Sequence, residues 1–156
     1  MKNNKPVKLD DLVSELELDN TFTFINTYTG EVITLMREEM GAAEDEEPLE
    51  KFPDWQRENI EKAVSIIEDA DGIYVDFTLR NNINEYDIIE EFIGTLKDQK
   101  IREEIYGAIQ GRGAFRRYKD RIVEYGVDKQ WYKYKESKLK ELVIEWCKEQ
   151  GIEVQE

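Results

Sequence analysis

The sequence predicts a mainly helical α+β fold, in which a small antiparallel sheet of about three strands packs against five or six helices. Segments rich in Thr, Val, Ile and Phe occur before residue 80, as is typical of strands. Elsewhere apolar residues recur every three or four positions, which indicates amphipathic helices. The chain has 156 residues, 40% of them hydrophobic, so it is long enough to bury a core. We expect a single domain over residues 1–156, because no internal repeat or low-complexity linker interrupts the pattern.

The first part of the chain predicts a short helix followed by a hairpin. Residues 7–18, "VKLDDLVSELEL", place apolar side chains at helical spacing: Leu9, Leu12, Val13 and Leu16. Residues 21–36 contain two runs of strand-forming residues on either side of "NTYTGE". Asn26 and Gly30 in that motif suit a turn, so the two runs are expected to pair as antiparallel strands.

A dense acidic segment separates the hairpin from the next helix. Like charges at this density repel one another, so we expect a mobile acidic loop at residues 41–51. A helix is then predicted from Pro53, which suits a first helical position, to a stop at Gly72. The alternating residues of a third strand follow: Ile73, Val75 and Phe77.

The rest of the chain is predicted to be helical, in four segments. Asn84 is suited to cap the first of them, and Asp128 begins the last. Gly126 and Gly151 follow the final apolar positions of the third and fourth segments, where helices commonly end. The four segments are residues 84–96, 101–109, 114–125 and 128–150.

The residue types that are missing exclude several kinds of site. The chain has no histidine and a single cysteine, Cys147, so Ser-His-Asp catalysis, Cys-His catalysis and zinc sites are excluded. We expect no cofactor, and an inert, packed thiol at Cys147. The motif "DADG" lacks the glutamate of a calcium loop, because Thr78 stands six residues after Gly72. The remaining candidates for a carboxylate-metal enzyme are Asp76, Glu85, Asp87, Glu90 and Glu91.

The distribution of charge is uneven along the chain. The net charge is −14; residues 1–100 carry 25 acidic and 10 basic side chains, whereas residues 101–156 carry 11 and 12. Such asymmetry can mark an interaction surface. No stretch approaches the roughly 20 apolar residues of a membrane-spanning helix. We therefore expect a cytoplasmic protein that does not bind membranes.

The basic cluster in "GRGAFRRYKDR", residues 111–121, is the strongest functional signal. Its two glycines permit a tight turn before a helix N-terminus, where cations oppose the helix dipole. A bound anion would offset that cost, so we expect a phosphate or carboxylate group at this cluster. Trp131 and Tyr132 are expected to be its aromatic neighbours. The expected anion-binding residues are Arg112, Gly113, Arg116, Arg117, Lys119 and Arg121.

Three readings of the charge pattern stay open. The first is a non-enzymatic binding protein whose partner is an unknown protein, a nucleotide or a nucleic acid. The second is an acidic decoy that inhibits a nucleic-acid-handling protein through residues 38–50 or 85–91, and the third is the carboxylate-metal enzyme. Against the first, the arginines of the cluster could simply pair with the chain's own carboxylates.

Several motifs resemble a bacterial family that is catalogued only as an uncharacterised protein family of the UPF type. They are "TYTGEVI", "PDWQRENIEKA", "NEYDIIEEFI", "AIQGRGAFRRYKD" and "WYKYKESKLKELVIEWCKEQGI". The family hallmark is Gly-x-Gly-Ala-Phe-Arg-Arg-Phe-Lys-Asp with a downstream Trp-Tyr, and Tyr118 stands here where Phe is usual. The resemblance implies a cytosolic protein of bacterial or phage origin with no assigned activity, cofactor or catalytic residue.

Overall fold

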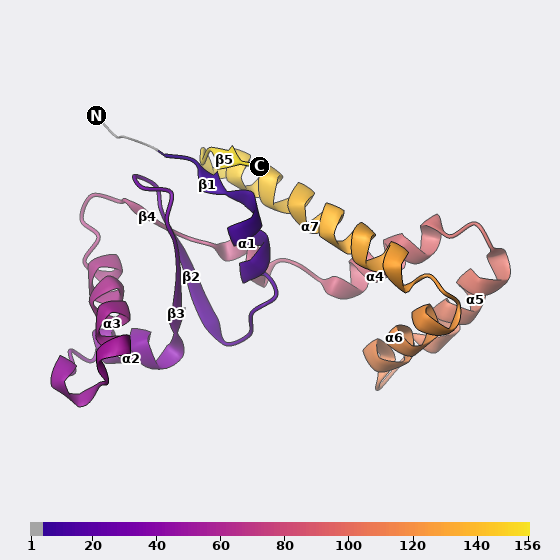
Figure 1. Ribbon diagram of the computed structural model, residues 1–156, viewed down its shortest axis with the longest axis horizontal. Helices are drawn as coiled ribbons and strands as arrows, with labels where there is room; N and C mark the ends of the chain where they lie inside the picture. Colours follow the sequence, from indigo (N-terminus) through magenta and orange to yellow (C-terminus); the bar gives the residue numbers. More distant parts are fainter. Residues whose placement is uncertain (1–4) are drawn as a thin grey trace. The chain divides into compact units, whose positions relative to one another are not determined.

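A computed structural model describes residues 5–156, and over this range the chain forms seven α-helices, two short 3-10 helices and five strands (Figure 1). The predicted mainly helical α+β class is confirmed, with more helices than the five or six expected. The chain divides into two compact units. Unit 1 comprises residues 5–82 together with Val143–Glu156, and unit 2 comprises Ile83–Leu142. Whether both fold as one cooperative domain stays a prediction.

The sheet of unit 1 contains the predicted hairpin and the predicted third strand. β2 (Thr21–Asn26) lies in the middle and pairs antiparallel with both β3 (Val32–Met36) and β4 (Tyr74–Asp76). Phe24 is opposite Ile33 on one side and opposite Asp76 on the other. This register places Phe24 and Ile25 on opposite faces, so each face of the sheet has its own core.

The turn between β2 and β3 is held by its own side chains. The Asn26 carboxamide oxygen accepts the backbone N–H groups of Tyr28 and Thr29, an arrangement that favours turns. Gly30 adopts a φ of +75°, and a Cβ at this position would lie 2.4 Å from the carbonyl oxygen of Pro6. Only glycine fits here without moving the backbone.

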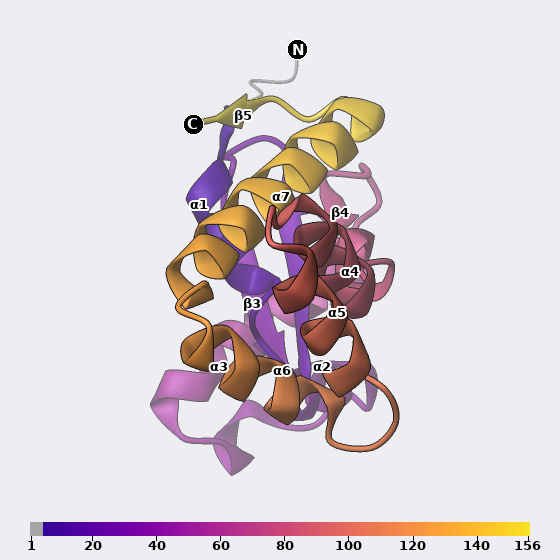
Figure 2. The same cartoon turned by 90° about the vertical axis from the view of Figure 1, so that its right-hand side faces the viewer.

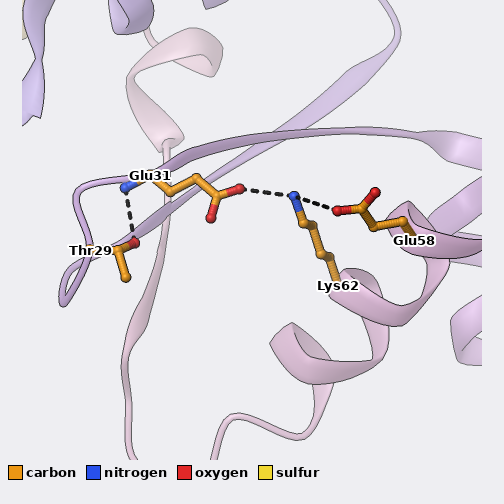
Figure 3. Close-up of polar contacts among 4 residues, drawn as sticks. All are labelled: Thr29, Glu31, Glu58 and Lys62. Carbon is orange, nitrogen blue, oxygen red and sulfur yellow. Dashed lines mark hydrogen bonds and ion pairs between the residues drawn. The ribbon is translucent and has the colours of Figure 1, made fainter.

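One lysine ties the hairpin turn to α3 (Asp54–Ile67), as Figure 3 shows. Lys62 Nζ lies 2.9 Å from a carboxylate oxygen of Glu31 and 3.9 Å from one of Glu58. The Glu31 backbone N–H in turn donates to the Thr29 hydroxyl oxygen at 3.2 Å. The Glu31 contact raises the pKa of the Lys62 ammonium, against a smaller lowering by burial. Exposed ion pairs of this kind each contribute at most about 1 kcal/mol.

Helices cover both faces of this sheet (Figures 1 and 2). On one face α2 (Arg37–Glu44) and α3 pack against the strands. The buried residues there are Ile33, Leu35, Ala42, Ala43, Ile60 and Ala63. On the other face α1 (Leu9–Glu15) and the end of α7 (Asp128–Gln150) enclose a second cluster. That cluster contains Val7, Leu9, Leu12, Ile25, Phe77, Val143, Trp146 and Cys147.

A second, two-stranded sheet joins distant parts of the sequence. β1 (Val7–Lys8) pairs in parallel with β5 (Val154–Gln155) (Figure 1), and Val7 is opposite Val154. No pattern in the sequence predicts this pair. Two-residue strands carry no periodic signal, and parallel partners far apart in sequence leave no turn motif between them.

The segment expected to be a mobile acidic loop, residues 41–51, contains regular structure. It includes the end of α2 and the 3-10 helix η1 (Leu49–Lys51). The mobility of the residues between them stays a prediction.

Elsewhere in unit 1 a second 3-10 helix, η2 (Thr78–Asn81), follows β4.

Unit 2 is a helical bundle formed by α4 (Glu85–Thr95), α5 (Gln99–Ala108), α6 (Ala114–Glu124) and the first part of α7. Asn84 and Asp98 cap α4 and α5 by accepting backbone N–H groups, as is usual for these residues. At the centre Trp131 contacts Phe92, with ring centroids 5.5 Å apart, and Tyr118, at 5.2 Å. Six isoleucines of the same unit are also buried: Ile88, Ile89, Ile93, Ile105, Ile109 and Ile122.

Candidate anion-binding loop

The loop between α5 and α6 has the geometry expected from its two glycines. Gly111 and Gly113 have φ values of +75° and +73°, and Gly113 is the N-terminal cap of α6. No side chain caps α6, and its first turn contains no acidic residue. Its first backbone N–H groups therefore have no side-chain acceptor at the cap position, in contrast to those of α4 and α5, which Asn84 and Asp98 cap.

Arg117 stabilises this loop through hydrogen bonds to three backbone carbonyls. Its Nε donates to the carbonyl oxygen of Ala108 at 2.7 Å, and its two terminal nitrogens donate to the carbonyls of Gln110 and Arg112. These bonds satisfy carbonyls at the end of α5 and across the turn. The Arg117 guanidinium is thus engaged inside the fold, and its predicted role in binding an external anion stays a prediction.

Three other cations of the cluster point to solvent. Arg112, Arg116 and Lys119 are exposed, and none has an ion pair or side-chain hydrogen bond with any of residues 5–156. Arg116 lies in the first turn of α6 and Lys119 one turn later, so both follow the same side of the helix. These three residues, together with the N–H groups at the start of α6, are defined here as the loop site.

Arg121 has a different environment. It forms an ion pair with Glu124 at 3.1 Å. Both side chains line a shallow depression of about 440 Å³ between α5 and α6, with Glu104, Gly107, Ala108 and Tyr125. Because two carboxylates already share this depression, Arg121 is less suited than Arg112 or Arg116 to receive an anion.

The two predicted aromatic neighbours differ in exposure. Trp131 is only 2% exposed and belongs to the core of unit 2, where it contacts Phe92 and Tyr118, so it presents no ring face to a ligand. Tyr132 is 55% exposed. It is the one of the two that is available to a ligand.

The hydroxyl of Tyr118 is the only buried side-chain polar atom without a hydrogen-bond partner within residues 5–156. Burial raises the pKa of this phenol strongly, and the charge of Glu85 raises it further. The ring is needed in the core, but the hydroxyl contributes nothing that the structure shows.

The carboxylate candidates are not gathered into a group of three in the described part of the chain. Within residues 5–156, no three acidic or cysteine side chains come close enough to hold a metal ion. Glu91 is paired with Lys138 at 3.3 Å, and Glu85 with Lys135 at 3.1 Å. Asp76 lies at the end of β4, where burial raises the pKa of its carboxyl.

Cys147 is completely buried in the core that α1 and α7 form in unit 1. Burial raises the pKa of its thiol to about 11. A thiol that is protonated at neutral pH and shielded from solvent is a poor nucleophile.

Over residues 5–156, no helix has the length and apolarity required to cross a bilayer.

Comparison with known proteins identifies the family of this chain. The sequence profile described as Uncharacterised protein family (UPF0158) matches residues 8–155. The chain belongs to this family. The match covers both units, including the loop site, and it confirms the resemblance noted from the sequence motifs. No curated protein and no solved structure matches the chain.

Sequence reasoning missed one recurrent feature, the binding of arginine forks to backbone carbonyls. Besides Arg117, Arg57 donates to the Phe52 carbonyl at 2.9 Å, Arg80 to that of Thr21 at 2.8 Å and Arg102 to that of Leu96 at 2.7 Å. Each contact secures a loop or a helix end. From the sequence, the expected internal partners of the cluster were carboxylates. Backbone carbonyls leave no signal in the sequence, because every residue has a carbonyl group that can accept a hydrogen bond.

Proposed function

We propose that this chain is a non-enzymatic binding protein whose loop site recognises a phosphate group on a small ligand. The observation that carries the proposal is that three exposed cations without internal side-chain partners lie in the loop and the first two turns of α6, whose N-terminus has no side-chain cap. Cations at this end of a helix oppose its dipole. A phosphate at the same place would accept both the free N–H groups and the arginine forks.

The balance of charge favours a small phosphate ligand over a nucleic acid. The chain carries a net charge of −14, which repels a polyanion over long distances. A single phosphate group requires only the local field of the loop site. A carboxylate on a partner protein is the competing ligand, because it offers similar acceptors but less charge.

The proposal is tested by titrating the intact chain with pyrophosphate and following backbone amide resonances by NMR. We expect saturable shifts concentrated at Gly113–Arg116. The double variant R112Q/R116Q should weaken binding about tenfold or more, because two charge-assisted contacts are lost. The matched control is K97Q/K100Q, which removes two exposed cations elsewhere in unit 2.

The control variant should bind pyrophosphate as the parent chain does. Equal weakening by both double variants would mean that bulk charge, and not the loop site, attracts the ligand. Absence of saturable shifts with pyrophosphate, but their presence with a glutamate-rich peptide, would assign the site to a carboxylate partner instead.

A further inference from the structure

Unit 1 contains an apolar groove between α2 and α3, well separated in sequence from the loop site. Its volume is about 410 Å³. The floor is formed by Ala42, Ala43 and Ile60, all buried, and the walls by apolar side chains including Val64 and Ile67. Ile67 is 47% exposed. The small side chains of the two alanines leave room above the helix for the side chain of another molecule.

Five carboxylates surround this groove and none is neutralised. None of the five has an ion pair or a side-chain hydrogen bond to any of the residues that the structure describes. The two cations of α3 are engaged elsewhere, Arg57 with Asp54 and two backbone carbonyls, and Lys62 with Glu31 and Glu58 (Figure 3). The rim residues are Glu44, Glu46, Glu47, Glu61 and Glu68.

The charge of the whole unit adds to this field. Over residues 5–82 and 143–156, unit 1 contains 24 acidic and 8 basic residues, a net charge of −16, whereas unit 2 contains 12 and 13. An apolar floor beneath an uncompensated negative rim is complementary to a segment that combines apolar side chains with lysine or arginine. Nucleic acids and anionic lipid surfaces are repelled by the same field.

We propose that this groove binds a basic amphipathic segment of a partner protein. The apolar side chains of the segment lie against Ala42, Ile60 and Val64, and its cations contact the glutamates of the rim. Burial of apolar surface supplies the affinity, while the charged rim accelerates association and selects against acidic segments. This inference is independent of the loop site, which lies in unit 2.

The end of α2 offers a variant that separates binding from folding. Glu46 adopts a φ of +53°, and the N–H groups of Glu46 and Glu47 donate to the carbonyls of Ala43 and Ala42. This is a helix-ending motif in which glycine is the preferred residue at position 46. E46G removes a rim carboxylate and the strain that a Cβ causes in the left-handed conformation at this position. We therefore expect the melting temperature to rise by about 2 °C.

The probe is a fluorescein-labelled synthetic peptide in which Leu and Lys follow an amphipathic helical pattern, and the readout is fluorescence anisotropy with the full chain. We expect saturable binding that weakens as salt is added. E46Q/E47Q/E68Q should weaken it about tenfold, since three exposed ion pairs are lost. I67S should also weaken it several-fold by removing apolar contact area, and E46G should weaken it while raising the melting temperature.

The matched control is D10N/D11N/D19N, which removes three exposed carboxylates from the same unit without touching the groove. It should leave the affinity unchanged. The proposal is overturned if this control weakens binding as much as the rim variant, or if I67S leaves the affinity unaltered. It is also overturned if sedimentation shows that the chain self-associates and that the rim variant restores the monomer, because the groove would then hold a second copy.

Discussion

Arg117 Nε donates to the carbonyl oxygen of Ala108 at 2.7 Å and thereby links the first turns of α6 to the last residue of α5. With its contacts to the carbonyls of Gln110 and Arg112, the guanidinium closes the loop on which the proposed phosphate site depends. Neighbouring arginines in the sequence therefore have different roles: Arg117 shapes the loop and Arg116 faces solvent.

The first prediction separates these two roles. R117Q should lower the free energy of unfolding by about 2 kcal/mol, because three charge-assisted hydrogen bonds to carbonyls are lost, one of them part-buried. R116Q should change it by less than about 0.5 kcal/mol, since the side chain is exposed and unpaired. Urea denaturation followed by circular dichroism measures both. Equal effects of the two variants would contradict the structural assignment of Arg117.

R117K gives a further check on the geometry. Lysine keeps the charge but cannot direct donors to three separate carbonyls. We expect R117K to recover less than half of the stability that R117Q loses, as measured in the same urea experiment. Full recovery would show that charge alone, without the planar fork, holds the loop.

The second prediction concerns the unpaired hydroxyl of Tyr118. Y118F retains the ring contact with Trp131 and removes a buried polar atom that has no partner. The free energy of unfolding should rise by about 1 kcal/mol at pH 7, because an unsatisfied buried group carries its full desolvation cost. Differential scanning calorimetry is a suitable measurement. A loss of stability would indicate that the hydroxyl has a partner in solution.

The third prediction concerns Gly30. G30A should destabilise unit 1 by about 2 kcal/mol or more, because φ is positive and the added Cβ would clash with the Pro6 carbonyl. The matched control is G72A, at a residue that also has positive φ but no atom within 4 Å of the added Cβ. Thermal unfolding should therefore show a larger fall in melting temperature for G30A than for G72A. The difference between the two variants gives the cost of the clash with the Pro6 carbonyl.

The fourth prediction is an alkaline loss of stability that depends on Cys147. Burial raises the pKa of its thiol from the ordinary 9.0 to about 11. Between these values the unfolded chain releases the proton and the folded chain retains it, so stability falls as pH rises. Well below pH 9 the thiol is protonated in both states and contributes no pH dependence.

C147A tests this prediction. The variant should be less stable at pH 7, because a buried side chain is shortened, but its stability should fall less steeply between pH 9 and 11 than that of the parent chain. Urea unfolding at pH 7, 9 and 10.5 gives the comparison. Parallel curves for the two proteins would mean that the thiol does not titrate differently in the folded state.

Much of the fold follows from local pattern. The hairpin is specified by strand-forming residues on both sides of Asn26 and Gly30, and the long helices by apolar spacing and by caps such as Asn84. What the sequence could not show is contact between distant positions. The β1–β5 pair is an example, since nothing near Val7 indicates that Val154 lies beside it.

The sequence predicts where the candidate site lies, but not which of its side chains face solvent. Glycine spacing located the turn, and helical spacing placed the arginines near it. The direction of each fork depends on which face of α6 meets α5: Arg117 is half-buried on that face, whereas Arg116, one residue earlier, is exposed. Trp131 was likewise assigned from its neighbours in sequence, although packing with Phe92 places it in the core.

The pairing of β1 with β5 has a consequence for the order in which the two units fold during synthesis. A ribosome completes every residue of unit 2 before it adds Val143–Glu156, which unit 1 needs for its second sheet and for Val143, Trp146 and Cys147 of its core. During translation the nascent chain therefore keeps Leu12, Ile25 and Phe77 without their final neighbours. The inserted helical bundle is made in one stretch and can fold first, while the surrounding unit closes only after the last strand is synthesised.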